Sequence, residues 1–440
     1  MTGNSTVRIG FGQGFWGDSS EAPVRLVEDG PLDYLALDYL AEVTMSILQK
    51  QYQENPSHGY ARDFPPLVER LAPTLLARGI QVLANAGGVN PRACAEEIRR
   101  RAPQLKVAVV EGDNLLPHLP ALLEAGEEFR NLDMGEPLAP LLDRLRSANV
   151  YLGAFPLAQA LASGAHVVVS GRCADAALAL APMIHRYGWR ADEVDKLAAG
   201  VVAGHIVECG AQTTGGNCLA DWRSIPDLAR IAYPVLEIQS DGACVVTKHE
   251  RYGNGPSGGR VSLASVKEQL VYEIGDPARY FTPDVVADFT TVRLAEDGPN
   301  RVRVSGARGL PAPEKLKVSI SYHWGWKAAG TLVFSAPHGA EKARRAAEIV
   351  WARCADLGLS FAGRNVEVFG EETALLRMAV RDPERRTVDR FTREMIPLVL
   401  NGPPGATGYG DGRPKVHEVV AYWPALVSRS VVAPKVEVLA

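Results

Sequence analysis

The sequence lacks long apolar runs. No stretch reaches the roughly 18 uninterrupted apolar residues that a transmembrane helix requires. The first residues, MTGNSTVRIGFGQGFWG, contain one Arg and then a glycine-rich segment, without the apolar core of a signal peptide. We therefore expect a cytoplasmic protein that has no membrane partner.

An excess of charge of one sign is also missing. The 440 residues include 47 Lys and Arg against 51 Asp and Glu, which gives a formal net charge of −4. Charge that is balanced and scattered does not produce the long-range field that attracts nucleic acid or anionic lipid. We expect neither of these partners, so a small molecule is the expected ligand.

Cysteine is sparse, and no C-x-x-C pair occurs. A chain of this length folds without disulfides, so we expect reduced thiols, most of them packed as small apolar residues. The six cysteines are Cys94, Cys173, Cys209, Cys218, Cys244 and Cys354.

From the start to about Gly216, short β-branched runs alternate with amphipathic stretches. This alternation is typical of a parallel sheet flanked by helices. The expected strands are Val7–Gly12, Tyr34–Leu37, Gln81–Asn85, Lys106–Glu111, Val150–Phe155 and Val167–Ser170. The expected helices are Phe64–Arg78, Pro91–Arg101, Leu115–Glu124, Pro137–Ser147, Ala174–Tyr187 and Leu197–Val207.

Beyond about Pro226–Pro234, β runs follow one another directly, which indicates hairpins in place of crossovers. The expected pairs are Val235–Ile238 with Ala243–Lys248, and Val292–Leu294 with Arg301–Val304. Further on we expect strands Val318–Tyr322, Thr331–Phe334 and Val366–Phe369, and helices Ala340–Leu357 and Glu384–Leu400. The expected fold class is α/β, with a mostly parallel sheet in domain 1–228 and a packed α+β domain over 229–440.

Candidate ligand-binding residues follow the expected strands. Ligands of open parallel sheets bind at the carboxyl ends of the strands, where glycine permits close approach and helix N-termini hold anions. The residues in these loops are Gly12, Asn85, Gly87, Gly88, Glu111, Asp113, Asn114, Ser170, Arg172 and Asp175. The first loop, GFGQGFWG, lacks the spacing of a dinucleotide fingerprint, so NAD is not expected.

Arg172 allows two interpretations. Its guanidinium can grip a carboxylate or phosphate bidentately, or it can form a structural ion pair with Asp175. If both hold, Asp175 orients Arg172 toward an anionic substrate group.

The densest polar cluster follows helix Leu197–Val207. His205 and Glu208 lie three residues apart on one helical face, so they suit a metal or an acid–base pair. Because no second ligand pair stands nearby, we expect a hydrogen-bonded pair and no metal. Glu111 with Asp113 is the alternative catalytic pair. The neutral donors Gln212, Thr213, Thr214 and Asn217 can cradle an oxyanion, or the segment is a satisfied interdomain hinge.

Five segments together carry a resemblance to a known family. They are AGHIVECGAQTTGGN (Ala203–Asn217), SGRCADAALALAPMIH (Ser170–His185), VEGDN (Val110–Asn114), EQLVYEIGDPARYFTPDV (Glu268–Val285) and NGPPGATGY (Asn401–Tyr409). On these motifs the chain resembles the acyclic terpene utilisation family of the AtuA type over essentially its whole length.

The resemblance implies an acid or CoA-thioester substrate, since family members occur with acyl-CoA carboxylases, hydratases and dehydrogenases that degrade branched acids. It offers no catalytic residues to carry over. Longer members carry an additional small ferredoxin-like domain, so a separately encoded small subunit or a homo-oligomer is an expected partner. No cofactor is expected, apart from coenzyme A as part of the substrate.

Two hypotheses of function follow. The first is a hydratase, lyase or hydrolase of branched or unsaturated acids or acyl-CoAs, in which Arg172 holds the anion and His205 or Glu208 moves the proton. The second is a non-catalytic subunit or ligand-binding partner in an acyl-CoA pathway.

Overall fold

The computed structural model of the chain describes residues 6–219, 222–408 and 412–439. Tyr409, at the end of NGPPGATGY, lies outside these residues. The chain forms two compact units: Met1–Pro140 with Ser147–Ile320 and Trp423–Ala440, and Leu141–Arg146 with Ser321–Tyr422. Both contain helices and strands, so the mixed α/β class is confirmed. The expected boundary at residue 228 falls inside the first unit, because strands on both sides of it join one sheet.

The first unit is built on a sheet whose described strands run in the order β13-β14-β8-β7-β1-β2-β3-β6-β4-β21. Its central strands are parallel, as predicted: β1 (Val7–Gln13), β2 (Tyr34–Leu37), β3 (Gln81–Ala84), β6 (Val167–Ser170) and β4 (Val107–Glu111). Antiparallel strands extend both edges: β7 (Pro234–Ile238), β8 (Cys244–Lys248), β14 (Val302–Ser305), β13 (Arg293–Glu296) and the late β21 (Lys435–Leu439). The two predicted hairpins are therefore confirmed, within this sheet.

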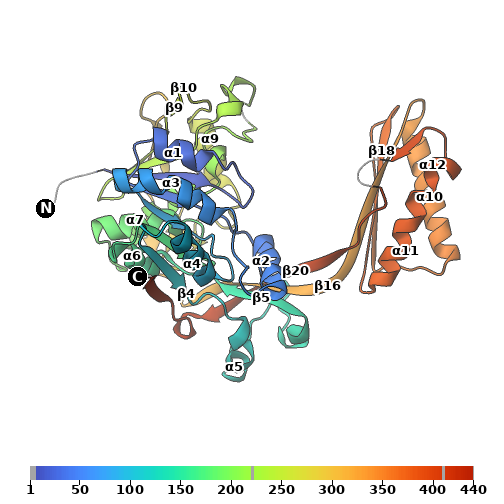
Figure 1. Cartoon of the computed structure of the whole chain (residues 1–440), viewed down its shortest axis with the longest axis horizontal. Coiled ribbons are helices and arrows are strands. Elements are labelled where there is room, and N and C mark those ends of the chain that lie inside the picture. Colours follow the sequence, from blue (N-terminus) through green and yellow to red (C-terminus); the bar gives the residue numbers. More distant parts are fainter. Residues whose placement is uncertain (1–5, 220–221, 409–411, 440) are drawn as a thin grey trace. The chain divides into compact units, whose positions relative to one another are not determined.

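Helices pack on the central strands. Alternate strand residues such as Leu35 and Leu37 join one apolar core with α1 (Ala22–Asp29), α3 (Phe64–Arg78) and α4 (Pro91–Arg101), which neighbour one another in Figure 1. Further helices of this unit are α2 (Glu42–Glu54), α5 (Leu119–Glu124), α6 (Ala154–Ala162), α7 (Ala177–Tyr187), α8 (Val194–Val207) and α9 (Leu263–Val271). The predicted bounds of α3 and α4 are confirmed, because Gly79 ends α3 at φ +65° and Asn90 caps α4 ahead of Pro91.

Two predicted elements are wrong. The strand expected at Val150–Phe155 is strand β5 (Leu145–Val150) followed by helix α6, and Pro137–Ser147 contains a 3-10 turn in place of an α-helix. Pro156 lies in the first turn of α6, where no N–H is needed. The carboxylate of Asp284 accepts the Ala154 N–H at 2.9 Å, a tertiary contact that no local pattern reveals.

Smaller strands complete the first unit. β11 (Tyr280–Phe281), β12 (Val286–Asp288) and β15 (Arg308–Leu310) form an antiparallel sheet, and α8 packs against β12 and β15. β9 (Arg251–Tyr252) pairs with β10 (Gly255–Pro256).

The second unit is an antiparallel sheet in the order β17-β18-β16-β19, with β5 and β20 (His417–Ser428) also paired to β16. Its elements are β16 (Lys315–Phe334), β17 (Gly363–Phe369), β18 (Ala374–Asp382), β19 (Ala406–Gly408), α10 (Gly339–Asp356), α11 (Arg385–Met395) and α12 (Leu398–Asn401). The strands expected at Val318–Tyr322 and Thr331–Phe334 are one strand, β16, which continues through Tyr322–Trp326. Helices α10 and α11 lie beside each other (Figure 1), and Phe391 of α11 shares one apolar core with Leu332 and Phe334 of β16.

Candidate functional site

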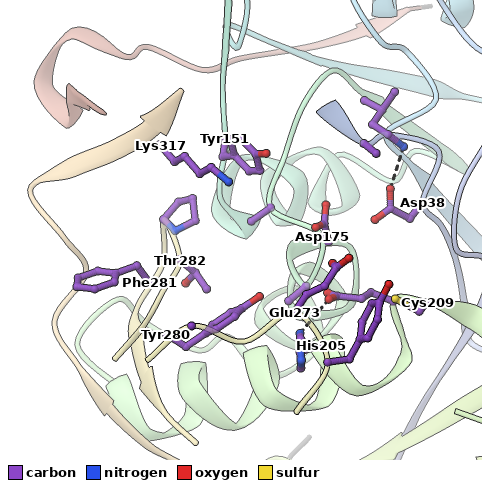
Figure 2. Close-up of a pocket in the computed structure, with 18 of the residues that line it drawn as sticks. Asp38, Tyr151, Asp175, His205, Cys209, Glu273, Tyr280, Phe281, Thr282 and Lys317 are labelled. Carbon is purple, nitrogen blue, oxygen red and sulfur yellow. Dashed lines mark hydrogen bonds and ion pairs between the residues drawn. The ribbon is translucent and has the colours of Figure 1, made fainter. Parts of the chain in front are cut away.

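A cavity of about 1370 Å³ lies in the first unit. Its walls come from the loops after β1, β2 and β6, the end of α8, the segment 272–283 and the start of β16 (Figure 2). The carboxyl ends of parallel strands thus form one side of it, which is where open α/β sheets bind ligands.

Two glycines allow the end of α8 to approach the strand ends. A Cβ on Gly204 would lie 2.8 Å from the Ala176 carbonyl oxygen, and a Cβ on Gly14 would lie 2.8 Å from the Cys209 carbonyl carbon. Real side chains do not tolerate such distances to backbone atoms. These positions therefore bring the chain around His205 into contact with the loops after β1 and β6.

Arg172 lines the cavity and is buried. Its Nη1 donates to Asp175 Oδ1 at 2.6 Å and to the Cys173 carbonyl at 2.9 Å, and its guanidinium carbon lies 4.2 Å from the centroid of the Tyr151 ring. The buried Nε has no hydrogen-bond partner among the described residues. The ion pair with Asp175 is thus present, yet one donor remains for a ligand or water, since a buried donor left unsatisfied costs about 1–3 kcal/mol.

Asp113 holds the backbone of Arg172 in place. The buried carboxylate accepts the Arg172 backbone N–H and the Asn149 amide, both at 2.8 Å. A Cβ on Gly171 would lie 2.4 Å from Asp113 Oδ1, so this turn requires glycine. Burial raises the pKa of Asp113 to about 6. Asp113 does not belong to the cavity wall and holds the loop that presents Arg172.

His205 and Glu208 both line the cavity and form the predicted hydrogen bond, with Nδ1 and Oε1 2.9 Å apart. Both side chains are buried in the wall of the cavity. Among the described residues, neither His205 Nε2 nor Glu208 Oε2 has a hydrogen-bond partner. The His205 ring packs against the rings of Tyr280 and Phe289, with centroids 5.3 and 5.4 Å away.

The environment shifts the pKa values of this pair. Burial raises the pKa of Glu208 to about 6, although His205 acts in the opposite direction. Burial lowers the pKa of His205, but the Glu208 carboxylate outweighs it and the net pKa lies above the usual 6.5. The pKa values of both groups are thus raised, and perturbed pKa values of this kind are typical of groups that transfer protons.

The polar segment after α8 divides into two roles. Gln212 and Asn217 line the cavity, and the buried Gln212 Oε1 has no partner among the described residues. Thr213 and Thr214 do not line the cavity. The Thr213 hydroxyl donates to the Ile206 carbonyl, and the Thr214 hydroxyl donates to the Ala232 carbonyl. These threonines hold the turn together.

The remaining predicted residues lie outside the cavity wall. Glu111 contacts Arg92 at 3.3 Å, while Asn114 accepts the Leu116 N–H at 3.1 Å. Glu111 and Asp113 therefore do not form a pair on the cavity. Among the other strand-end residues, packing or backbone contacts account for Gly12, Gly87, Gly88 and Ser170. Asn85 is buried behind the lining residue Asp38, to which it donates at 2.6 Å.

Sequence reasoning missed several lining residues. Asp38 directly follows β2, so the strand-end rule applies to it, but LDYL contains no glycine to draw attention. Glu273 and Tyr280 come from a distant segment, and Lys317 from the start of β16. Figure 2 shows Asp175 between Asp38 and His205, with Tyr280, Phe281 and Thr282 together on another side.

The rest of the wall mixes charged and apolar groups. The cations Arg279, Lys315 and Lys317 and the acids Glu273, Asp276 and Glu314 all line it. Large apolar side chains are exposed there, Phe15 and Phe281 at 58% each and Leu132 at 51%. Such a wall suits an amphipathic ligand more than a uniformly charged one.

A search of the described residues for three or more grouped His, Cys, Asp or Glu side chains able to hold a metal ion found none. Among the helices described, none is long and apolar enough to cross a membrane.

Comparisons with known proteins complete the description. Neither the curated proteins nor the solved structures contained a match. A comparison with protein families matches residues 7–438 to the description "Acyclic terpene utilisation family protein AtuA". Since the match spans nearly the whole chain and the resemblance noted in its motifs is thereby confirmed, the protein belongs to the AtuA family of acyclic terpene utilisation proteins.

Proposed function

We propose that the protein is an enzyme of carboxylic acid or acyl-CoA catabolism that works by proton transfer, as a hydratase, lyase or hydrolase does. The observation that carries the proposal is the buried His205–Glu208 pair in the cavity wall. One atom of each side chain is used in the pair, and the other has no partner among the described residues. Membership of a family named for terpene utilisation supports a catabolic role.

The proposed chemistry uses three parts of the wall. The His205–Glu208 pair accepts a proton from the substrate, because it lies in the cavity wall and burial raises the pKa of Glu208 to about 6, which makes it a stronger base than an ordinary carboxylate. Arg172 binds an anionic group through the N–H groups that Asp175 leaves open. The amides of Gln212 and Asn217 stabilise a developing oxyanion.

The proposed substrate is a branched or unsaturated acid or its CoA thioester. The cavity of about 1370 Å³ exceeds the roughly 300–1,000 Å³ of ordinary small-ligand sites. Its apolar side chains accept a hydrocarbon chain, and the cations Arg279 and Lys315 in its wall can bind phosphates. The neighbouring acids would oppose a polyphosphate, so free acids and thioesters both have to be compared.

The test uses crotonyl-CoA, 3-hydroxybutyryl-CoA and the two corresponding free acids in D₂O. We expect the purified protein to interconvert one hydroxylated and unsaturated pair, or at least to exchange the Cα hydrogen for deuterium, as followed by NMR. Exchange should disappear in His205→Asn and Glu208→Gln. The exposed His118→Asn and Glu124→Gln provide matched controls that should keep it.

A non-catalytic ligand-binding subunit is the outcome that would contradict this proposal. It would bind one of the four compounds in calorimetry without exchange or turnover, and the variants at His205 and Glu208 would change affinity alone.

A further inference from the structure

Asp38 is a buried acid in the same cavity that the proposed proton-transfer pair does not use. It follows β2, its backbone N–H donates to the Gln13 carbonyl at 3.0 Å, and 4% of its surface is exposed. Its side chain lines the cavity. The position of this carboxyl is therefore set by the sheet and not by a flexible loop.

The hydrogen bonds of Asp38 distinguish its two oxygens. Oδ1 accepts the Leu40 N–H at 3.0 Å and the Asn85 amide at 2.6 Å (Figure 2 draws the Asp38 side chain). The Asn85 orientation is fixed, because its own Oδ1 accepts the Tyr39 N–H at 2.7 Å and a backbone N–H can only donate. Both donors thus meet Oδ1, and since no hydrogen bond from the described residues reaches Oδ2, that oxygen remains for the cavity.

The charged surroundings favour a proton on this carboxyl. Burial and the neighbouring Asp175 carboxylate raise the pKa of Asp38 well above its usual 3.8, against the opposing effects of Arg172 and the two donors. The thiols that face Asp38 do not add charge near neutral pH, because burial raises the pKa of Cys209 to about 12 and that of Cys173 still higher. Arg172 is already paired with Asp175.

We propose that Asp38 is a neutral carboxylic acid whose Oδ2–H donates a proton to an oxygen of the substrate, as the partner of the His205–Glu208 base. The inference rests on the proposed function and adds the general acid to it. Asp175 lies between Asp38 and His205 (Figure 2), so the acid and the base flank one carboxylate.

The two groups together complete a dehydration. The His205–Glu208 pair takes the Cα proton, and the electron pair of that C–H bond forms the double bond. The C–O bond at the neighbouring carbon breaks, and the hydroxyl leaves as water with the proton of Asp38. Asp38 is then a carboxylate, which regains a proton from solvent while the base releases one. Hydration is the reverse, so a 3-hydroxyacyl compound is the substrate class on one side and a 2-enoyl compound on the other.

Infrared difference spectra of wild type minus Asp38→Asn test the protonation state without an assay. We expect the carbonyl band of a protonated carboxyl in this difference spectrum at pH 7, and the spectrum of the exposed Asp143→Asn control should lack that band. Asp38→Ser, which also removes the carboxyl group, provides a second background should the Asn variant not fold. A carboxylate band at pH 7 would overturn the proposal whatever the activity shows.

Turnover of 3-hydroxybutyryl-CoA tests the donor role. Asp38→Asn should reduce dehydration at least about 100-fold while Cα deuterium exchange, which needs only the base, falls much less. Equal loss of both reactions, or wild-type dehydration, would overturn the proposal and leave the proposed function intact. If the wild type turns over none of the compounds, the proposed function fails. The infrared band still tests the role of Asp38, because a carboxyl that donates a hydrogen bond to a ligand should change its band when crotonyl-CoA is added. A band that does not shift would overturn the proposal.

Discussion

The two units of the protein each contain a His–Glu pair, and the two pairs differ in every respect but the contact. His205 and Glu208 are 2.9 Å apart with side chains 1% and 10% exposed, and His323 and Glu418 are 2.7 Å apart with side chains 24% and 19% exposed. Arg146 also binds Glu418 Oε1 at 2.9 Å, whereas Glu208 Oε2 has no partner among the described residues.

The consequence is a pKa shift of opposite sign. Burial raises the pKa of Glu208 to about 6. Burial also acts to raise the pKa of Glu418, but hydrogen bonds from His323 and Arg146 outweigh it, so the pKa lies below its usual 4.5. A His–Glu contact is therefore not evidence of catalysis. Glu208 is desolvated and, among the described residues, has no arginine bound to it as Glu418 has Arg146, which is what makes the first pair suited to proton transfer.

The largest expected difference between the pairs is in turnover. His205→Asn and Glu208→Gln should each lower the rate at least about 100-fold, because they keep shape and remove proton transfer. His323→Asn and Glu418→Gln should leave it within about twofold. Steady-state kinetics on the compound identified in the screen measures both sets. A comparable loss of turnover in the variants at His323 and Glu418 would contradict the claim that only the buried pair transfers protons.

Alanine substitutions at one glycine in each unit compare how tightly the two units are packed. Gly171→Ala should destabilise the protein by about 1–3 kcal/mol, since its Cβ would overlap the Asp113 carboxylate. Gly363→Ala in β17 meets no atom closer than 3.8 Å and should be neutral or slightly stabilising. Urea denaturation gives both free energies of unfolding. Equal values would mean that the loop around Arg172 moves away without strain.

Arginine pairs allow a third comparison. Arg172→Lys should weaken binding of the ligand about tenfold, because lysine keeps the charge but loses the planar fork and the stacking on Tyr151. Arg377→Lys disturbs an exposed pair with Glu367 in the second unit and should change stability by less than about 1 kcal/mol, without effect on binding. Calorimetric titration and thermal melting are the measurements. Unchanged affinity with a lowered melting temperature would show that Arg172 is only an ion-pair partner.

The smallest expected effect is in the pH dependence of stability. A carboxyl whose pKa is raised on folding binds its proton more tightly in the folded state, so Glu208 makes the free energy of unfolding fall as pH rises from 4.5 through about 6. Glu418 has a lowered pKa and contributes stability above pH 4.5 that is lost as the pH falls.

Glu208→Gln should therefore flatten the stability profile between pH 4.5 and 6, and Glu418→Gln should flatten it below pH 4.5. Urea denaturation at a series of pH values separates the two. Profiles that change in the same window for both variants would show that the pairs do not differ in the stated way.

Part of this site was predictable from the sequence. The spacing of His205 and Glu208 on one helical face predicts their contact, and the structure has it. The rule of strand ends that predicts Arg172 also applies to Asp38, although the loop after β2 contains no glycine to mark it. Asp113 and Glu111 follow β4 in the same way, yet one supports a loop and the other meets Arg92. Sequence position cannot separate these roles, since each depends on partners far away in the chain.

The sequence by itself determined the family and the local features of the fold, namely the parallel strands and the bounds of α3 and α4 with their glycine and proline signals. Tertiary structure decided that β16 continues as one strand through Tyr322–Trp326 and that the Asp284 carboxylate accepts the first N–H of α6. It also decided that Thr214 holds a turn while Gln212 lines the cavity. The physical reason is the range of the forces involved. Periodicity and capping act over a few residues, whereas burial and the pairing of charges depend on every segment that surrounds a group.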